Sequence, residues 1–357
     1  MKYLSIIVLG SVQAFAQEAQ SGVEVSATIS GEAVQSHTLS ESPRGGFDMA
    51  AGFRAVLYPT WKIDDHWSVT GSFQLYSAPY FYDQFSTQGY GLYGNIQQAS
   101  LNYSSFFDGG SVTIRAGELS SAFGSFLLRY DDAVNPLIDI PLSYGYYYEG
   151  VSILPVAGAQ ADVTFGKLDA RVQFANSSAF NPRSILDRDQ YGNWAAGAGY
   201  TIRQGLRVGG SAYRGPFLDR KFPYFAPGEI PPNRLIGSAV GVDFSWGHGP
   251  WNVYGEWQYF HMDYTQIPTY REHVGYGEVR RTLSPRWYVA ARAGAFHAND
   301  VAPFQVYEIA AGYRASRFEV IKLDYEVGRG TTLHGPLSNT LAIQFVTTLG
   351  PFSAARN

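Results

Sequence analysis

The sequence predicts an all-β fold, a transmembrane antiparallel up-and-down β-barrel of about 16 strands with a long third extracellular loop folded into the lumen. Three observations predict it. Short segments that alternate apolar and polar residues recur along the chain, as in strands with two unlike faces. Long and short connections alternate, as in barrels with long extracellular loops and short periplasmic turns. Aromatic residues make up 16% of the chain and charged residues only 16%, which suits strands between lipid and water.

Residues 1–16 have the organisation of a secretory signal peptide. Lys2 supplies the positive charge, an apolar run follows, and Ala14-Phe15-Ala16 fits a cleavage site. The apolar run is too short to cross a bilayer as a helix, and the rest of the chain has no apolar stretch of that length. We therefore expect a mature barrel domain at 17–357. The sequence has no Cys, which excludes disulfides and Cys-ligated metals.

Five strands are predicted before the long segment. The third is the clearest, because Trp67, Val69 and Phe73 alternate with small polar residues. Its apolar face, together with Phe53 and Val240 on other strands, is expected to contact lipid. The five predicted ranges are 23–33, 47–58, 67–75, a fourth that ends at 104, and 112–116.

Eleven further strands are predicted after the long segment, ten of them in hairpins closed by short turns. In lipid every backbone N–H and C=O needs an internal partner, so an open sheet edge is not tolerated and the sheet must close. The ranges are 159–165 with 168–174, 194–203 with 206–213, 236–246 with 251–262, 273–283 with 287–296, 304–314 with 318–327, and 341–349.

The even number of strands predicts that both termini lie in the periplasm and that the protein resides in the bacterial outer membrane. The alternative is a soluble β-sandwich or propeller, which would need a second apolar face on each strand to build its core. The faces opposite the apolar ones are instead rich in Ser, Thr, Gln, Gly and charge. Trp residues near strand ends also suit the aromatic girdles of a membrane barrel. They are Trp61, Trp67, Trp194, Trp246, Trp251 and Trp287.

The segment Gly117–Gly158 fits neither strand pattern, and it is long for a connection in a compact fold. Its many Tyr, Phe, Leu and Ile residues argue against disorder. We expect it to fold into the lumen, where its apolar side chains would pack against small wall residues such as Gly197 and Gly241. The alternative is that it caps the barrel from outside. The apolar side chains concerned are Phe126, Leu127, Leu128, Leu137 and Ile138.

The candidate functional site is a pore constriction formed by this segment and the opposite wall. Asp131, Asp132 and Asp139 would face basic wall residues and set up a transverse field that filters polar solutes and ions. The other inward-facing charges are expected mainly to solvate and cross-link the lumen. The basic residues assigned to the constriction are Arg129 on the segment and Arg54, Arg115 and Arg292 on the wall.

The run Arg115-Ala116-Gly117-Glu118-Leu119, followed by Phe123-Gly124, resembles the strand-to-loop junction of the phosphate-selective porin O and P family. As an architecture, the whole barrel resembles the 16-stranded porins of Gram-negative bacteria. That resemblance implies a third loop folded into the lumen and a possible homotrimer. Family members that select phosphate line the pore with many Lys and Arg, whereas this sequence has only five Lys.

The function expected is diffusion of small hydrophilic solutes or ions through a water-filled barrel. The alternatives are an outer-membrane barrel enzyme, phospholipase-like or protease-like, and a structural barrel with a plugged lumen. The expected partners are the permeating solutes or ions and outer-membrane lipid. We expect no enzyme activity and no cofactor.

Other motifs carry little functional signal. The net charge of −4 is not typical of a nucleic-acid-binding protein. Residues 89–94 match G-x-G-x-x-G, but a strand follows where the dinucleotide fingerprint requires a helix. The seven His are scattered without metal-ligand spacing, and there is no G-x-S-x-G elbow. We therefore expect no metal site.

Overall fold

The computed structural model describes residues 21–37, 39, 48–78, 80, 91–144, 155–176, 192–218, 230, 232–264, 268–332, 335–336 and 339–355. The expected signal peptide at 1–16 lies outside these residues, as does the 145–154 part of the long segment. No helix in the part of the chain described here is long and apolar enough to cross a membrane.

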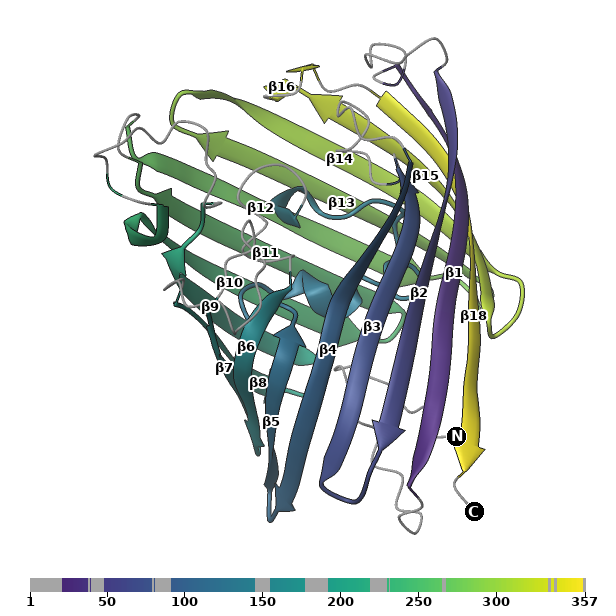
Figure 1. Ribbon diagram of the computed structural model, residues 1–357. Helices are drawn as coiled ribbons and strands as arrows, with labels where there is room; N and C mark the ends of the chain where they lie inside the picture. Colours follow the sequence, from purple (N-terminus) through teal and green to yellow (C-terminus); the bar gives the residue numbers. More distant parts are fainter. Residues whose placement is uncertain are drawn as a thin grey trace.

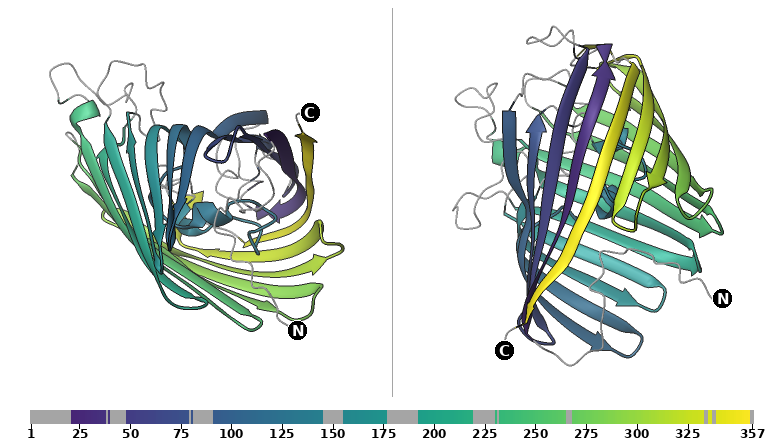
Figure 2. Two further views of the ribbon diagram at one scale, coloured as in Figure 1. Left: turned by 90° about the horizontal axis from the view of Figure 1, so that it is seen from below. Right: turned by 90° about the vertical axis from the view of Figure 1, so that its right-hand side faces the viewer.

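Sixteen antiparallel strands form one closed barrel, in which each strand pairs with its neighbours along the chain and β1 pairs with β18 (Figures 1 and 2). The predicted closed antiparallel barrel is confirmed, and each of the 16 predicted strands is present. The strands before the long segment are β1 (Gly22–Ser36), β2 (Met49–Lys62), β3 (Trp67–Ala78), β4 (Gly91–Phe107) and β5 (Gly110–Leu119).

The later strands carry the barrel back to β1, and a small two-stranded sheet, β16 (Thr331–Thr332) and β17 (Gly335–Pro336), lies between β15 and β18. Three short 3-10 helices are η2 (Phe126–Arg129), η3 (Leu142–Tyr144) and η4 (Pro232–Arg234). The later barrel strands are β6 (Val156–Phe165), β7 (Leu168–Ala175), β8 (Asn193–Arg203), β9 (Leu206–Pro216), β10 (Ile236–His248), β11 (Trp251–Met262), β12 (Tyr270–Thr282), β13 (Trp287–Ala298), β14 (Val301–Arg314), β15 (Glu319–Arg329) and β18 (Asn339–Ala355).

The two faces of the sheet are inverted relative to a soluble protein. The apolar side chains of Phe53, Val69 and Val240 are 41%, 36% and 47% exposed. On the opposite face, the charged side chains of Arg54 and Lys322 are each 1% exposed. Large apolar side chains cover the outside and charges are buried within, which suits a barrel surrounded by lipid. The predicted assignment of faces is confirmed at these positions.

The short turns and the described ends of the barrel lie at one end of the molecule. Gly22 is the register partner of both Lys62, beside the β2–β3 turn, and Ala355, at the end of β18. In that turn the carboxylate of Asp64 accepts hydrogen bonds from the backbone N–H groups of Trp67 (2.7 Å) and His66 (2.8 Å). These bonds favour the charged form and lower the pKa of the Asp64 carboxyl.

The alternation of long and short connections has one exception, so the prediction of strict alternation was wrong there. Only Asn299 and Asp300 join β13 to β14, where the pattern indicated a longer loop from 297 to 303. Asp300 has φ 62°, a left-handed conformation that Asn and Asp adopt more readily than most residues. The tight turn therefore extends both strands beyond the predicted limits.

Candidate functional site

The chain between β5 and β6 contacts the wall of the barrel at many points. Its described part, 120–144, contains only η2 and η3 as regular structure. Phe123, Phe126, Leu137 and Tyr144 are each 0% exposed. Backbone N–H and C=O groups in such a buried irregular segment need partners outside it. The wall supplies many of them.

Two glycines shape the path into this segment, and both belong to the run that carries the family resemblance. Gly117 has φ +137° and Gly124 has φ +83°, values that side chains disfavour. A Cβ at Gly117 would lie 2.2 Å from the carbonyl oxygen of Ala99 on β4. A Cβ at Gly124 would lie 2.2 Å from the hydroxyl of Tyr144. Larger residues at either position would displace the segment.

Strands β7 and β9 hold the first turn of the segment. The side-chain amide of Gln173 accepts a hydrogen bond from the Ala122 N–H (3.1 Å) and donates one to the Ser120 carbonyl (2.9 Å). Arg171 donates to the Gly124 carbonyl, and Ser211 Oγ accepts from the Gly124 N–H (3.1 Å). Side chains of the wall thus replace a β-sheet partner for this stretch.

Glu256 on β11 ties together the two ends of the described segment. Its carboxylate accepts hydrogen bonds from the N–H (3.0 Å) and hydroxyl (2.9 Å) of Ser125. It also accepts from the hydroxyl of Tyr144, at 2.7 and 2.8 Å. Burial, and then the nearby Glu256 charge, raise the pKa of Tyr144 well above its usual value. Tyr144 therefore remains a donor at neutral pH.

Arg129 contacts strand β12, with Nη1 2.6 Å from Glu278 Oε1 and Nη2 2.9 Å from the hydroxyl of Tyr276. Its guanidinium also lies over the ring of Tyr254, 4.0 Å from the centroid. Burial opposes the charge, but Tyr276 and Glu278 outweigh it, so the pKa of Arg129 is raised. The partner of this predicted constriction residue is thus an acid of the wall.

Asp132 forms the ion pair that most resembles the predicted constriction. Arg54 Nη1 on β2 donates to its carboxylate at 2.8 Å, and both side chains are buried. The hydroxyls of Ser30 and Tyr80 also donate to it, the latter at 2.9 Å. The neighbouring Asp131 accepts from the hydroxyl of Tyr58 on β2. Asp132 therefore contacts β1 and β2, and Asp131 contacts β2.

Lys322 and Arg292 bind backbone carbonyls of the segment. Lys322 Nζ on β15 donates to the carbonyls of Asp132 (2.6 Å) and Leu137 (3.1 Å). Arg292 on β13 donates to the carbonyl of Asp139 (2.6 Å) and forms an ion pair with Glu308 on β14. Arg292 was one of three wall cations expected to face the acids of the segment. Its hydrogen bond to Asp139 is to the backbone carbonyl, which needs a donor in this irregular segment.

Carboxylates of the wall accept hydrogen bonds from backbone N–H groups of the same segment. Asp324 on β15 accepts from the Ile138 N–H (3.2 Å), and Glu308 accepts from the Asp139 N–H (3.4 Å). Cations of the wall therefore bind the carbonyls of the segment, and anions bind its N–H groups. Much of the wall charge satisfies the backbone of the segment.

The apolar side chains of the segment pack against wall residues that include small ones, but Gly197 and Gly241 are not among those in the clusters. Leu137 packs in a cluster with Tyr288 and Ala290 of β13, and Ile138 with Val34 of β1. Phe126 packs against Tyr144 and Tyr276. The space beside Gly241 is occupied by Ser211 and Gln258. The space beside Gly197 is occupied by the Arg171 side chain, with the backbone oxygen of Ala122 next to it. The side chains of Leu127 and Leu128 lie outside the described residues.

Arg115, the remaining predicted constriction residue, pairs with a neighbouring strand. Its Nε lies 3.1 Å from Asp162 on β6, and both side chains are partly exposed. Cross-strand pairing explains this, since the two residues are near neighbours on the lumen face of adjacent strands. Its predicted pairing with a loop acid is not among the contacts of the described residues.

The wall at β3 and β4 has a different composition. Neither strand contains Asp, Glu, Lys or Arg. Thr70, Gln98, Ser100 and Asn102 bond to one another, with Ser100 Oγ 2.9 Å from Asn102 Oδ1 and Asn102 Nδ2 3.0 Å from Thr70 Oγ1. We call this surface the neutral wall. Its hydroxyl and amide groups form hydrogen bonds with neighbouring side chains of the same sheet.

Several site residues were not identified from the sequence. Tyr58, Tyr80 and Tyr144 contact the acids, yet a Tyr in a Tyr-rich chain carries no distinctive signal. The alternation along the strands does place Glu256 and Lys322 on the lumen face. From the sequence, however, they were expected only to solvate and cross-link the lumen. Their specific contacts depend on which residues of the segment 120–144 lie next to them.

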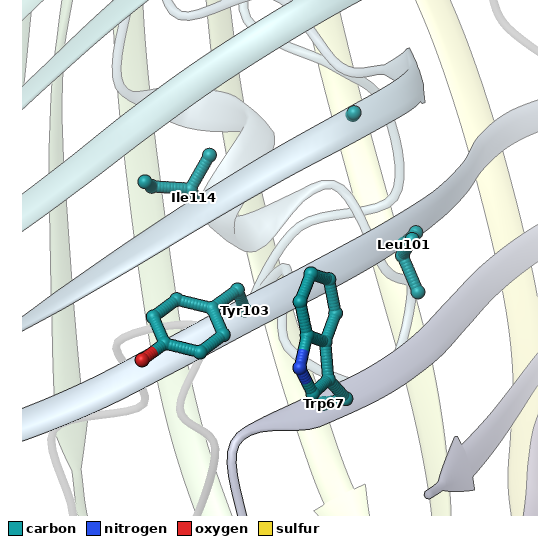
Figure 3. A pocket seen from close by; sticks show the side chains of 5 residues that line it. Trp67, Leu101, Tyr103 and Ile114 are labelled. Carbon is teal, nitrogen blue, oxygen red and sulfur yellow. The ribbon is translucent and has the colours of Figure 1, made fainter.

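An apolar hollow of about 400 Å³ lies on the outer face of β3, β4 and β5 (Figure 3). It is lined by Trp67, Leu101, Tyr103, Ile114 and Ala116. Because these side chains belong to the outward face of the barrel, the hollow is separate from the lumen. Among the described residues no group of three or more His, Cys, Asp or Glu could hold a metal ion.

No known family model matches this chain, and no curated protein matches its sequence. Solved structures do match. The outer membrane channel DcaP of Acinetobacter baumannii is 13% identical with a TM-score of 0.62, and the match covers 94% of this chain and 99% of that one. An anion-selective porin from Comamonas acidovorans is 10% identical with a TM-score of 0.64, covering 92% and 100%.

OmpT, expressed in the outer membrane of Vibrio cholerae, is similar to the same degree. It is 13% identical, with a TM-score of 0.60 and coverage of 93% and 99%. At such identities the likeness establishes the fold. The chain has the closed antiparallel barrel of Gram-negative outer-membrane porins and channels, and the predicted architecture is confirmed at that level.

Proposed function

We propose that this chain is an outer-membrane diffusion channel for small hydrophilic solutes or ions, narrowed by the segment 120–144. One observation carries the proposal: the segment bonds to side chains on the lumen faces of strands far apart around the barrel. Asp132 binds Arg54 on β2 and Lys322 on β15, and Tyr144 binds Glu256 on β11. A cap outside the barrel would not need partners at these positions.

The passage we propose runs between this segment and the neutral wall. The segment bonds to side chains of β1, β2, β7, β9 and β11–β15. On β3 and β4 the hydroxyl and amide groups bond mostly to one another, and the Ser120 hydroxyl of the segment donates to the backbone carbonyl of Gln97 on β4 (3.3 Å). A hydrated solute moving along such a wall meets no fixed charge. The Arg115–Asp162 pair on β5 and β6 borders the passage and supplies a local dipole.

The proposal includes the cellular placement expected from the sequence. Residues 1–16 would be removed on export, and 17–357 would form the barrel in the outer membrane. The short turns and the ends of β1 and β18 would face the periplasm, since porin-like barrels place short turns there. A homotrimer is the assembly proposed from the resemblance to porins.

Deletion of Asp131–Ile140 tests the narrowing directly. In planar bilayers the single-channel conductance should rise by roughly twofold or more, because the deletion removes the part held by Arg54, Lys322 and Arg292. A deletion of equal length at 181–190, in the β7–β8 connection, is the control and should change conductance much less. Unchanged conductance after the first deletion contradicts the narrowing.

Exchanging Asp131, Asp132 and Asp139 for Asn tests the field across the constriction. The reversal potential under a salt gradient should shift towards anions, since three carboxylates are lost.

The wild-type recording also separates the alternatives. A barrel enzyme or plugged barrel would give no steady ion current through a folded, heat-modifiable protein. A stable current of defined step size supports the channel.

A further inference from the structure

A row of basic side chains lies on the outward face of β9–β13, at the end of the barrel opposite the short turns. In this stretch the alternate residues, such as Phe260, Glu272 and Phe296, are buried on the lumen side. The outward residues Arg214, Arg271, His273 and His297 are exposed, and the His261 side chain is 34% exposed. We call these five outward residues the outer basic belt.

The strand register brings the members of the belt together. His261 is the direct partner of Arg271, and His273 is the direct partner of His297. Ser238 on β10 lies between Arg214 and His261, as the partner of both. Directly opposed Cβ atoms in such pairs lie about 4.5–5.5 Å apart. Neighbouring side chains can therefore reach one ligand group together.

The belt borders the lipid-facing surface. Immediately nearer the middle of β11, on the same face, lie Tyr259 and Trp257. Their rings are 6.5 Å apart at 8°, and the His273 ring lies 4.7 Å from that of Tyr259. Val240 and Val242 follow on β10, both exposed. Aromatic rings of this kind mark the membrane–water interface, so the belt sits at the level of lipid headgroups.

The acidic residues near the outer basic belt do not neutralise its two arginines. Asp263 lies 3.3 Å from His261 Nε2, and Asp300 accepts a hydrogen bond from Asn299. Within the described strands β1–β8, the outward positions at this end carry no Lys or Arg, and β5 has Glu118 there. Positive charge at this rim is therefore concentrated on one side of the barrel.

We propose that the outer basic belt binds the phosphate groups of lipid headgroups in the leaflet at this end of the barrel. Arg binds phosphate through two parallel N–H donors, and imidazole N–H groups add further donors. The adjoining aromatic and aliphatic surface continues towards the membrane centre, where the acyl chains of the same lipid would lie. This continuity favours a lipid over a free anion. The inference rests on the proposed membrane placement, but not on conduction.

Arg271 and Arg281 provide a matched pair for the test. Both face outward on β12, but Arg281 lies at the short-turn end, over the ring of Trp251. Native mass spectrometry in detergent micelles would measure binding of bisphosphorylated lipid A and of the same lipid without phosphates. Wild type should prefer the phosphorylated form about tenfold. Arg271→Gln with His273→Gln should remove that preference, and Arg281→Gln should keep it.

Loss of preference in Arg281→Gln, or no preference in wild type, would overturn the proposal. So would equally tight binding of inorganic phosphate alone, or a belt-dependent dimer in lipid-free detergent, because each assigns the belt another occupant. Conductance of the double variant should equal that of wild type. If wild type retains the lipid but passes no current, the channel proposal fails and the belt stands.

Discussion

The lumen wall has two unlike sides. On β1, β2 and β11–β15 it carries buried charges such as Arg54, Glu256, Arg292 and Lys322, which bind the segment 120–144. On β3 and β4 it carries none, and its hydroxyls and amides bond to one another. We call the first the charged side and keep the name neutral wall for the second.

The difference between the two sides indicates that the buried charges serve to bind the segment. A buried charge is strongly unfavourable unless it is paired and hydrogen-bonded. The segment offers such partners, because its irregular backbone presents carbonyls and N–H groups that no sheet satisfies. On β3 and β4 the segment makes a hydrogen bond from the Ser120 hydroxyl to the Gln97 carbonyl (3.3 Å), and the neutral side chains bond mostly to one another. The following predictions test this division, from the largest expected effect to the smallest.

The largest effect is expected at the Arg54–Asp132 pair on the charged side. Asp132→Ala should lower the free energy of unfolding by about 3–5 kcal/mol, because buried Arg54 loses its carboxylate partner. Urea unfolding in lipid vesicles would measure it. Arg54→Met with Asp132→Leu should recover much of the loss. A loss below about 1 kcal/mol for Asp132→Ala would mean that the pair is solvated, as on a protein surface.

A second prediction compares the outer face with the lumen face. Phe53→Arg or Val240→Arg should cost about 2–4 kcal/mol if the position lies near the bilayer midplane. Ser72→Arg on the neutral wall should cost far less, since its side chain would reach water. Similar losses at all three positions would contradict the assignment of faces.

The structure changes the expectation for Gln344. The strand alternation places it on the lumen face, where Arg should be tolerated as well as at Ser72. Gln344 is 0% exposed and donates to the hydroxyl of Tyr80, which in turn binds Asp132. Gln344→Arg should therefore destabilise the protein more than Ser72→Arg, because it places a further cation in a buried position directly opposite Lys322. The same unfolding assay ranks the two variants.

A smaller effect is expected within the neutral wall. Asn102→Ala removes bonds to Ser100 and Thr70 and should cost about 1 kcal/mol, the usual net contribution of neutral hydrogen bonds. The ratio of this loss to that of Asp132→Ala measures how far the two sides differ. Equal losses would remove the distinction between them.

The smallest change in stability is expected for Ser68→Lys at the short-turn end of the neutral wall. Ser68 is only half-buried, so unfolding should change by no more than about 0.5 kcal/mol. The new charge should nevertheless shift the reversal potential towards anions, because it adds a cation beside Lys62 to a strand that has no charged side chain of its own. Ser68→Ala is the control and should leave selectivity unchanged. No shift in the Lys variant would place the ion path elsewhere.

The sequence by itself determined the barrel. Strand alternation has a period of two residues and depends only on near neighbours, so the number of strands and the faces of Phe53, Val69 and Arg54 could be read directly. The absence of charge in β3 and β4 was equally visible. The tight turn at Asn299-Asp300 was missed, because the same residue types also occur in longer loops.

The tertiary structure decided what the inward charges do. Lys322 and the carbonyls it binds lie more than a hundred residues apart in the chain. A carbonyl has no residue-specific signature, so side-chain charge could predict Arg54 with Asp132 but not Arg292 with the backbone of Asp139. Periodicity fixes which face a side chain occupies, whereas its partner depends on the path of a segment that only the closed barrel can hold.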